Sequence, residues 1–190
     1  MRRRTCDINV TAVGAMLTVV LAVAGALAIW GYTFATDAVK DQLAEQQIFF
    51  PAKDSPAMTP EIAEHLEKYA GQQLTTGDQA YAYAEHYIKV HLRETADGKT
   101  YAQVSTESRA NPADPQLKAQ VETLFRGETL RGLLLNAYAF WTVGQIALWA
   151  GIASFTAAGV MLALTIAGLM HLRRVDPQEE MLAGRPPATA

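Results

Sequence analysis

Two long stretches without a formal charge constrain this chain more than any other feature of its sequence. Residues 8–36 and residues 132–170 contain no Asp, Glu, Lys, Arg or His, which makes uncharged runs of 29 and 39 residues. The hydrocarbon core of a bilayer is about 30 Å thick and is crossed by about 20 apolar residues in a helix. Each run is long enough to span it, so the sequence predicts a mainly α-helical membrane protein with two transmembrane helices.

The first run has a competing interpretation as a cleaved signal peptide, because Arg2, Arg3 and Arg4 form a basic segment in front of it. The apolar part of a signal peptide covers about 7 to 15 residues. Here the apolar stretch extends over residues 10–32, and no convincing cleavage site follows it before Asp37. We therefore favour an uncleaved membrane anchor.

Charges at the ends of the two runs predict the orientation. Arginines precede the first run, and Arg173 and Arg174 follow the second. Positive residues mark the cytoplasmic ends of spans, so both termini of a plasma-membrane protein are expected in the cytoplasm. Residues 36–131 carry 10 Lys and Arg against 15 Asp and Glu, a net charge of −5, and are expected outside. Aromatic residues near Trp30 and Trp141 mark the predicted outer interface.

These features divide the chain into five segments. The second span is placed late in its run because 39 residues of helix measure about 58 Å, so that part of the run lies outside the bilayer. We expect a cytoplasmic N-terminus (1–9), a first transmembrane helix (10–34), an extracytoplasmic helical domain of about 100 residues (35–142), a second transmembrane helix (143–172) and a disordered cytoplasmic tail (173–190).

Helix start and stop residues indicate three helices in the central domain. They are predicted over residues 60–70, over 77–97 and from 115 onward, where Asp114 and Pro115 supply a cap and a first-turn proline. Two glycines, Gly127 and Gly132, either weaken the last helix or lie within a helix that continues into the second span.

Two short segments, residues 48–51 and 100–104, are predicted to be extended and are candidates for pairing with each other. Beside the second one, Gly98, Lys99 and Thr100 match the end of a phosphate-binding loop. The full motif needs a glycine where this chain has Arg93, and the preceding segment is expected to be helical rather than a strand. We interpret the string as a turn and expect no nucleotide.

Residues suited to metal binding or catalysis are sparse. His86 and His91 lie five positions apart, which turns them about 140° from each other on a helix. Glu61 and His65 share a helix face, a spacing that usually marks a solvated pair. The single cysteine, Cys6, excludes an intrachain disulfide, and the net charge of −3 does not indicate nucleic acid. We expect no catalytic residue, no metal and no cofactor, and therefore no enzyme.

The two spans carry small residues at every fourth position. This spacing lets helices approach closely in lipid, although alanine is also common throughout the chain. We expect these residues to pack helices together, either the two spans or a span and another protein. They are Gly14, Thr18, Ala22 and Ala26 in the first span and Ala150, Ser154 and Ala158 in the second.

The leading hypothesis is a non-catalytic plasma-membrane protein that contacts the lipid bilayer and binds another membrane or envelope protein through its outer domain. An accessory subunit of a respiratory complex is one form of such a protein. The alternative is an envelope sensor or small-ligand-binding module, with a candidate pocket lined by Tyr81, Tyr83 and Tyr87. A transporter or channel is the third hypothesis. It would require an oligomer, because the two spans of one chain cannot form a path across the membrane by themselves.

Three short strings, in this order between the two spans, resemble a family of proteins. They are Asp41-Gln42-Leu43-Ala44-Glu45-Gln46, Ala80-Tyr81-Ala82-Tyr83-Ala84-Glu85 and Asp97-Gly98-Lys99-Thr100-Tyr101-Ala102. The family consists of small actinobacterial membrane proteins with two transmembrane helices, mostly uncharacterised and often labelled aromatic ring-opening dioxygenase. The likeness covers about residues 10–174 and is interrupted at residues 48–73.

The resemblance implies the same two-span topology. Its label implies ring cleavage by an iron that two histidines and a carboxylate hold in extradiol enzymes. This chain has no recognisable triad of that kind, so we take the resemblance as an indication of topology and not of activity.

Overall fold

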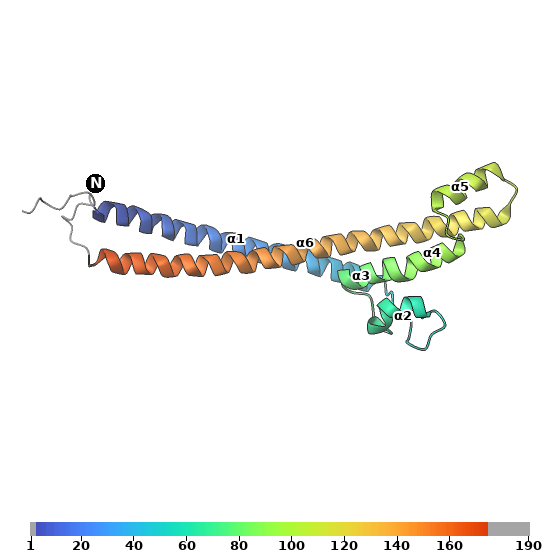
Figure 1. Cartoon of the computed structure of the whole chain (residues 1–190), viewed down its shortest axis with the longest axis horizontal. Helices are drawn as coiled ribbons and strands as arrows, with labels where there is room; N and C mark the ends of the chain where they lie inside the picture. Colours follow the sequence, from blue (N-terminus) through green and yellow to red (C-terminus); the bar gives the residue numbers. More distant parts are fainter. Residues whose placement is uncertain (1–2, 175–190) are drawn as a thin grey trace, which may run out of the picture. The chain divides into compact units, whose positions relative to one another are not determined.

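The structure is a computed structural model that describes residues 3–174 (Figure 1). This part of the chain is mostly helical and contains no strand. It divides into two compact units, one formed by Met1–Gly31 with Ala147–Ala190 and the other by Tyr32–Ile146. Most of the predicted tail, residues 175–190, lies outside the described residues.

Two helices, α1 (Arg3–Glu45) and α6 (Pro115–Leu172), contain 43 and 58 residues. At 1.5 Å per residue they measure about 65 Å and about 87 Å. Both are long and apolar enough to cross a membrane. Helix α1 continues eleven residues past position 34, the predicted end of the first span, and α6 passes Gly127 and Gly132 without a break.

In the unit formed by the two chain ends, α1 and α6 pack against each other in antiparallel directions (Figure 1). A methyl group on Gly14 would lie 2.8 Å from the hydroxyl oxygen of Thr165, and one on Gly151 would lie 2.8 Å from Ile29 Cδ1. Glycine at these positions thus lets the two helices pack closely. The small residues of the spans pack the two spans on each other.

The contact face of this helix pair alternates steps of three and four residues. The covered positions are Thr11, Gly14, Thr18, Leu21, Gly25 and Ala28 on α1 and Gly151, Ser154, Ala158, Met161, Thr165 and Gly168 on α6. This is the spacing of a coiled-coil seam.

The predicted four-residue repeat is therefore only partly right. Gly14, Thr18 and Ala22 on α1, and Ser154 and Ala158 on α6, are at least partly covered, whereas Ala26 and Ala150 are exposed. Four residues turn a helix by about 400°, so a strict repeat of four drifts about 40° per step and leaves the contact face.

The outer surface of the same pair is apolar. Leu27 is 63% exposed, Val160 56% and Leu164 61%. Side chains of this size cost free energy in water and none in a hydrocarbon phase. Thr18 and Thr165 satisfy their hydroxyls within their own helices, at 2.9 Å from Gly14 O and 2.7 Å from Met161 O. The surface suits a bilayer on all sides of the pair.

The second unit places short helices against the outer ends of α1 and α6. Helix α2 (Pro60–Leu66) continues as a 3₁₀ turn, η1 (Glu67–Tyr69), and the chain reverses at Gly71 with a φ of 69°. Helix α3 (Gly77–Tyr83), a π-helix, η2 (Ala84–Ile88), and α4 (Lys89–Thr95) form one helical segment. The predicted helices after Thr59 and Thr76 are confirmed, but the π-helical turn was not foreseen.

The prediction of an extended segment at residues 100–104 is wrong, because helix α5 (Tyr101–Ala110) occupies it. Thr100 accepts a hydrogen bond from the Gln103 amide at 3.4 Å, and the Gln103 side chain accepts one from the Thr100 amide at 2.8 Å. This reciprocal capping box starts a helix despite the β-branched and aromatic residues around it. Only Phe49 in residues 48–51 forms an antiparallel bridge, and its partner is Gln73.

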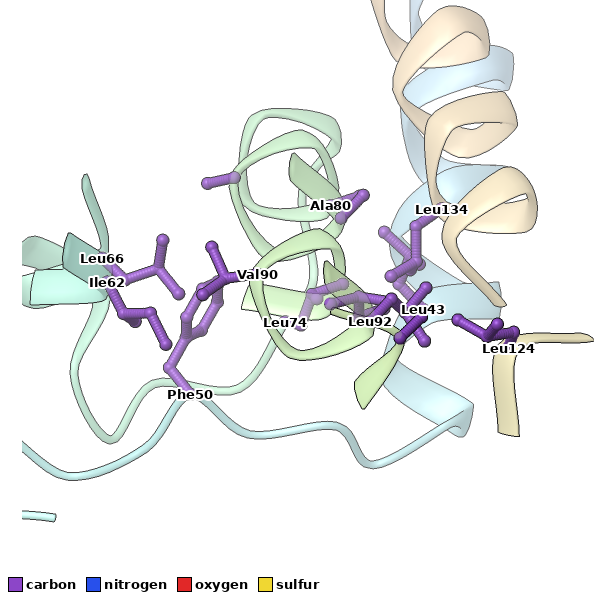
Figure 2. Close-up of a cluster of buried hydrophobic side chains, with 14 of the residues drawn as sticks. Leu43, Phe50, Ile62, Leu66, Leu74, Ala80, Val90, Leu92, Leu124 and Leu134 are labelled. Atoms are coloured by element: carbon purple, nitrogen blue, oxygen red, sulfur yellow. The ribbon is translucent and has the colours of Figure 1, made fainter. Parts of the chain in front are cut away.

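A continuous hydrophobic core holds this unit together (Figure 2). At one end of the core, Phe50 lies beside Ile62, Leu66 and Val90. At the other end, Leu43 of α1 and Leu134 of α6 belong to the same core. Leu66 and Leu74 are fully buried at 0% exposure. Trp141 and other residues of 132–142 pack at the edge of this core, which explains why the uncharged run exceeds one membrane thickness.

Candidate functional site

A polar cleft of about 450 Å³ opens within the Tyr32–Ile146 unit. Helices α2, α3, α4 and α6, the π-helix η2 and the turn at Gly98 contribute to its walls. It contains three acidic and three basic side chains, two histidines and a tyrosine. The lining residues are Glu61, His65, Tyr81, Glu85, His86, Lys89, Val90, Leu92, Arg93, Gly98, Lys99, Thr100, Leu124 and Glu128.

The π-helix places two of these side chains, Glu85 and His86, in the cleft. A π-helical turn adds one residue to the helical repeat and rotates the side chains that follow it. Such turns are rare and occur frequently at functional sites. This irregular turn is the main reason for placing a candidate site here.

Glu85 joins the π-helix to α6. Its carboxylate accepts a hydrogen bond from Lys89 Nζ at 2.6 Å and pairs with the Arg131 guanidinium, which also bonds Glu128 at 3.0 Å. Burial by itself would raise the pKa of Glu85, but the hydrogen bonds from Lys89 and Arg131 outweigh it and lower that pKa below its ordinary value. Glu85 is therefore ionised at neutral pH and acts as a tether.

Two histidines stack across the cleft. The rings of His65, from α2, and His86, from η2, have centroids 3.8 Å apart and planes inclined by 25°. Burial, and then the nearby charge of His65, lower the pKa of His86, against the opposing effect of Glu85 and Glu64. The two imidazoles therefore meet face to face. Among residues 3–174, no three His, Cys, Asp or Glu side chains form a cluster suited to a metal ion.

The basic residues of the cleft wall bind carboxylates of the same unit. Arg93 contacts both carboxylate oxygens of Glu61, at 2.7 and 2.8 Å, and Lys99 bonds Glu107 at 2.7 Å. The Thr100 hydroxyl caps α5, and Gly98 adopts a φ of 80°. The Gly-Lys-Thr string is thus a turn and a helix cap. The cleft is thus a polar surface whose basic side chains are largely paired with carboxylates of the same unit.

The three tyrosines predicted to line one pocket lie on two sides of the helix. Tyr83 packs 5.3 Å from Phe50 and 4.7 Å from Tyr87, measured between ring centroids, and burial followed by Tyr87 raises its pKa to about 12. Tyr81 lies 4.8 Å from Tyr138 and lines the cleft. Residues two apart on a helix do not share a face, so the structure separates Tyr81 from the other two.

Sequence reasoning considered His65 and His86 separately and did not bring them together, and it missed Glu85 and the Arg131 that pairs with it. His65 and His86 are 21 positions apart, and no spacing rule brings them together. One sequence feature could have singled out Arg131: it is the last charged residue before the 39-residue uncharged run. A charge at that boundary needs a partner, and Glu85 supplies it.

The ion pairs of Glu85 predict a loss of stability in acid. Its pKa is lowered in the folded protein, so its stabilising contribution is present above the unfolded pKa and is lost as pH falls through the folded pKa. We expect the melting temperature of the purified protein to fall as pH drops below about 4.5. In Glu85→Gln this part of the pH dependence should disappear, while Glu107→Gln, at an exposed pair, should retain it. Equal acid sensitivity in the wild type, Glu85→Gln and Glu107→Gln would contradict the assignment of this pH dependence to Glu85.

No protein family, no curated protein and no solved structure matches this chain in comparisons of sequence and structure.

Proposed function

We propose that this chain is a non-catalytic integral membrane protein whose α1–α6 pair anchors the Tyr32–Ile146 unit outside the cytoplasm. Three features support the proposal. The paired helices are long enough to span, their outer surface is apolar, and the hydroxyls of Thr18 and Thr165 on the contact face are hydrogen-bonded within their own helices. The small residues pack the two spans against each other. We therefore expect a protein partner to bind the Tyr32–Ile146 unit.

The orientation is the first part to test. Single cysteines at Ser55 and Ser105 should react with a membrane-impermeant maleimide in intact cells, because both positions belong to the unit proposed to lie outside. Cys6 and a cysteine at Thr189 should react only after the membrane is permeabilised. Labelling at Thr189 without labelling at Ser105 would invert the topology, and a shortened product would indicate that the first span is cleaved.

We propose that the polar cleft binds another membrane or envelope protein. The observation that carries this proposal is the wall of the cleft, where the π-helical turn follows directly on α3 and is tied to α6 by ion pairs, and where Tyr81 on α3 is exposed. Tyrosine and arginine dominate the energetics of protein interfaces, and Tyr81 and Arg93 both line this cleft. A rigid wall also lowers the entropic cost of association.

Capture of partners from native membranes tests the cleft. The tagged full-length protein is crosslinked in cells at native expression level and purified in mild detergent. A specific partner should be recovered with the wild type and reduced about tenfold with Tyr81→Ala, a change worth about 1.4 kcal/mol. Tyr101→Ala is the matched control, since Tyr101 is a similarly exposed tyrosine outside the cleft. Respiratory-chain subunits among the specific partners would identify an accessory subunit.

The second candidate, an envelope ligand sensor, uses the same cleft. The volume of the cleft, about 450 Å³, lies within the range of small-molecule sites. Recovery of the protein as a lone monomer would weigh against the partner proposal. A small molecule retained by the wild type in native mass spectrometry, and lost from Tyr81→Ala, would favour the sensor.

A further inference from the structure

A second hollow in the Tyr32–Ile146 unit has a different character from the cleft. It is a groove of about 480 Å³ between the outer part of α1 and the first half of α6. None of its lining residues carries a charge, and ten of them are apolar. Three amide side chains, Gln42, Gln46 and Asn136, supply its polar groups.

Large apolar side chains stand uncovered along this groove. Phe34 on α1 is 58% exposed, and Leu133 and Phe140 on α6 are 64% and 51% exposed. A folded unit leaves such a contiguous apolar surface bare only at a free-energy cost, and patches of this kind mark binding sites. The charged residues of this part of α1 are exposed and lie outside the lining; they are Asp37, Lys40, Asp41 and Glu45.

The groove walls continue the two uncharged runs. Phe34 belongs to residues 8–36, while Leu133, Ala137 and Phe140 belong to residues 132–170. On both helices the groove lining therefore includes uncharged sequence of the kind that forms the predicted spans. A soluble polar ligand would find no ion-pairing partner in the lining.

The size of the groove suits one hydrocarbon chain. From Phe34 to Leu43 it follows α1 for about 14 Å, at 1.5 Å per residue, and Gln46 and Ile48 extend it past the end of the helix. A methylene group is about the size of a water molecule, whose share of liquid volume is about 30 Å³, so 480 Å³ has room for about 16 methylenes. The amides offer neutral hydrogen-bond donors to ester carbonyls.

We propose that this groove holds one acyl chain of a membrane lipid. The site is separate from the polar cleft and goes beyond the proposed partner binding. A bound chain would cover Phe34, Leu133 and Phe140 and would stabilise the outer ends of α1 and α6 against each other. The chain would thus be a structural ligand at the base of the unit.

Photolabelling of the full-length protein tests this proposal. The protein is reconstituted into phosphatidylcholine vesicles that contain a small fraction of phosphatidylcholine with a diazirine at the end of a 16-carbon chain. After irradiation, mass spectrometry locates the labelled residues. We expect labels at groove residues such as Leu133 and Phe140 in excess of those on equally exposed span residues such as Leu27.

Variants that fill the groove provide the decisive comparison. Ala38→Phe and Ala137→Phe, on opposite walls, should reduce groove labelling about tenfold, because a filled groove excludes the chain. Ala139→Phe is the matched control, since Ala139 is exposed on α6 and outside the lining. Leu133→Gln, at a 64% exposed position, makes the wall polar without touching the core and should reduce labelling too.

Several results would overturn the proposal. One is labelling spread evenly over the exposed apolar residues of α1 and α6, and another is unchanged groove labelling in both filled variants. A photoreactive residue at position 133 that crosslinks in native membranes to a polypeptide or to a second copy would show a protein occupant. Because Tyr81→Ala does not touch this groove, partner capture and lipid labelling can fail separately.

Discussion

Leu66→Ala should destabilise the Tyr32–Ile146 unit by about 3–4 kcal/mol, in the middle of the range for buried Leu-to-Ala changes. Leu66 ends α2, is 0% exposed and packs among Phe50, Ile62 and Val90 (Figure 2). The substitution removes apolar contacts and leaves a cavity that a dense core fills only in part. The effect is large because α2 is only seven residues long and depends on Ile62 and Leu66 for its attachment.

The measurement is hydrogen exchange of the full-length protein in detergent micelles, read over amides 60–110. Faster exchange confined to this region is expected for Leu66→Ala, together with a fall in melting temperature of more than about 10 °C. Leu133→Ala is the control, because its side chain is 64% exposed and should cost less than about 1 kcal/mol. Similar exchange in both variants would show that α2 is not held by this core.

Gly77→Ala is expected to destabilise the same unit by about 1–3 kcal/mol, although it adds one methyl group and improves helix propensity. Gly77 is the first residue of α3 and is buried against α6. A methyl group there would overlap Cβ and Cγ of Trp141. These atoms adjoin the α6 backbone and cannot rotate away, so α3 and α6 would have to separate.

Gly132→Ala is the matched comparison on α6. A methyl group at Gly132 meets no atom within 4 Å. Helix propensity alone then predicts a gain of about 0.5–1 kcal/mol. Thermal unfolding of the two variants should therefore move in opposite directions. If Gly77→Ala melts at or above the wild-type temperature, the close packing of α3 on α6 is not required for stability.

Patterns local in the chain predicted much of the fold. Asp114 and Pro115 indicated the start of α6, and Asp114 Oδ1 accepts hydrogen bonds from the amides of Gln116 and Leu117 at 2.8 and 3.2 Å. In the same way, the capping residue Thr76 indicated the helix that follows it. Gly71 indicated the end of the preceding helix, where the chain reverses. These predictions succeed because capping and turn preferences depend on residues within four positions of each other.

Predictions that depended on partners distant in the chain were less successful. Residues 100–104 have the composition of a strand, but no strand partner is available in the described residues, and the Thr100 and Gln103 box starts a helix. Gly127 and Gly132 are poor helix formers, yet α6 passes both, and Gly127 packs closely on Leu92. At Gly127 this tertiary contact outweighs a propensity cost of about 1 kcal/mol, whereas Gly132 has no such contact and is tolerated within the long helix.

The sequence by itself determined that this chain is mainly helical and has two segments able to span a membrane, because an uncharged run of about 20 residues or more has few other stable environments. Only the tertiary structure decided which small residues meet, since the contact face follows steps of three and four and uses Gly25 and Gly151 in place of Ala26 and Ala150. It also decided the cleft, where His65, Glu85 and Glu128 converge from α2, η2 and α6. A one-residue π-helical insertion and packing between distant helices produce that convergence, and neither follows from local spacing.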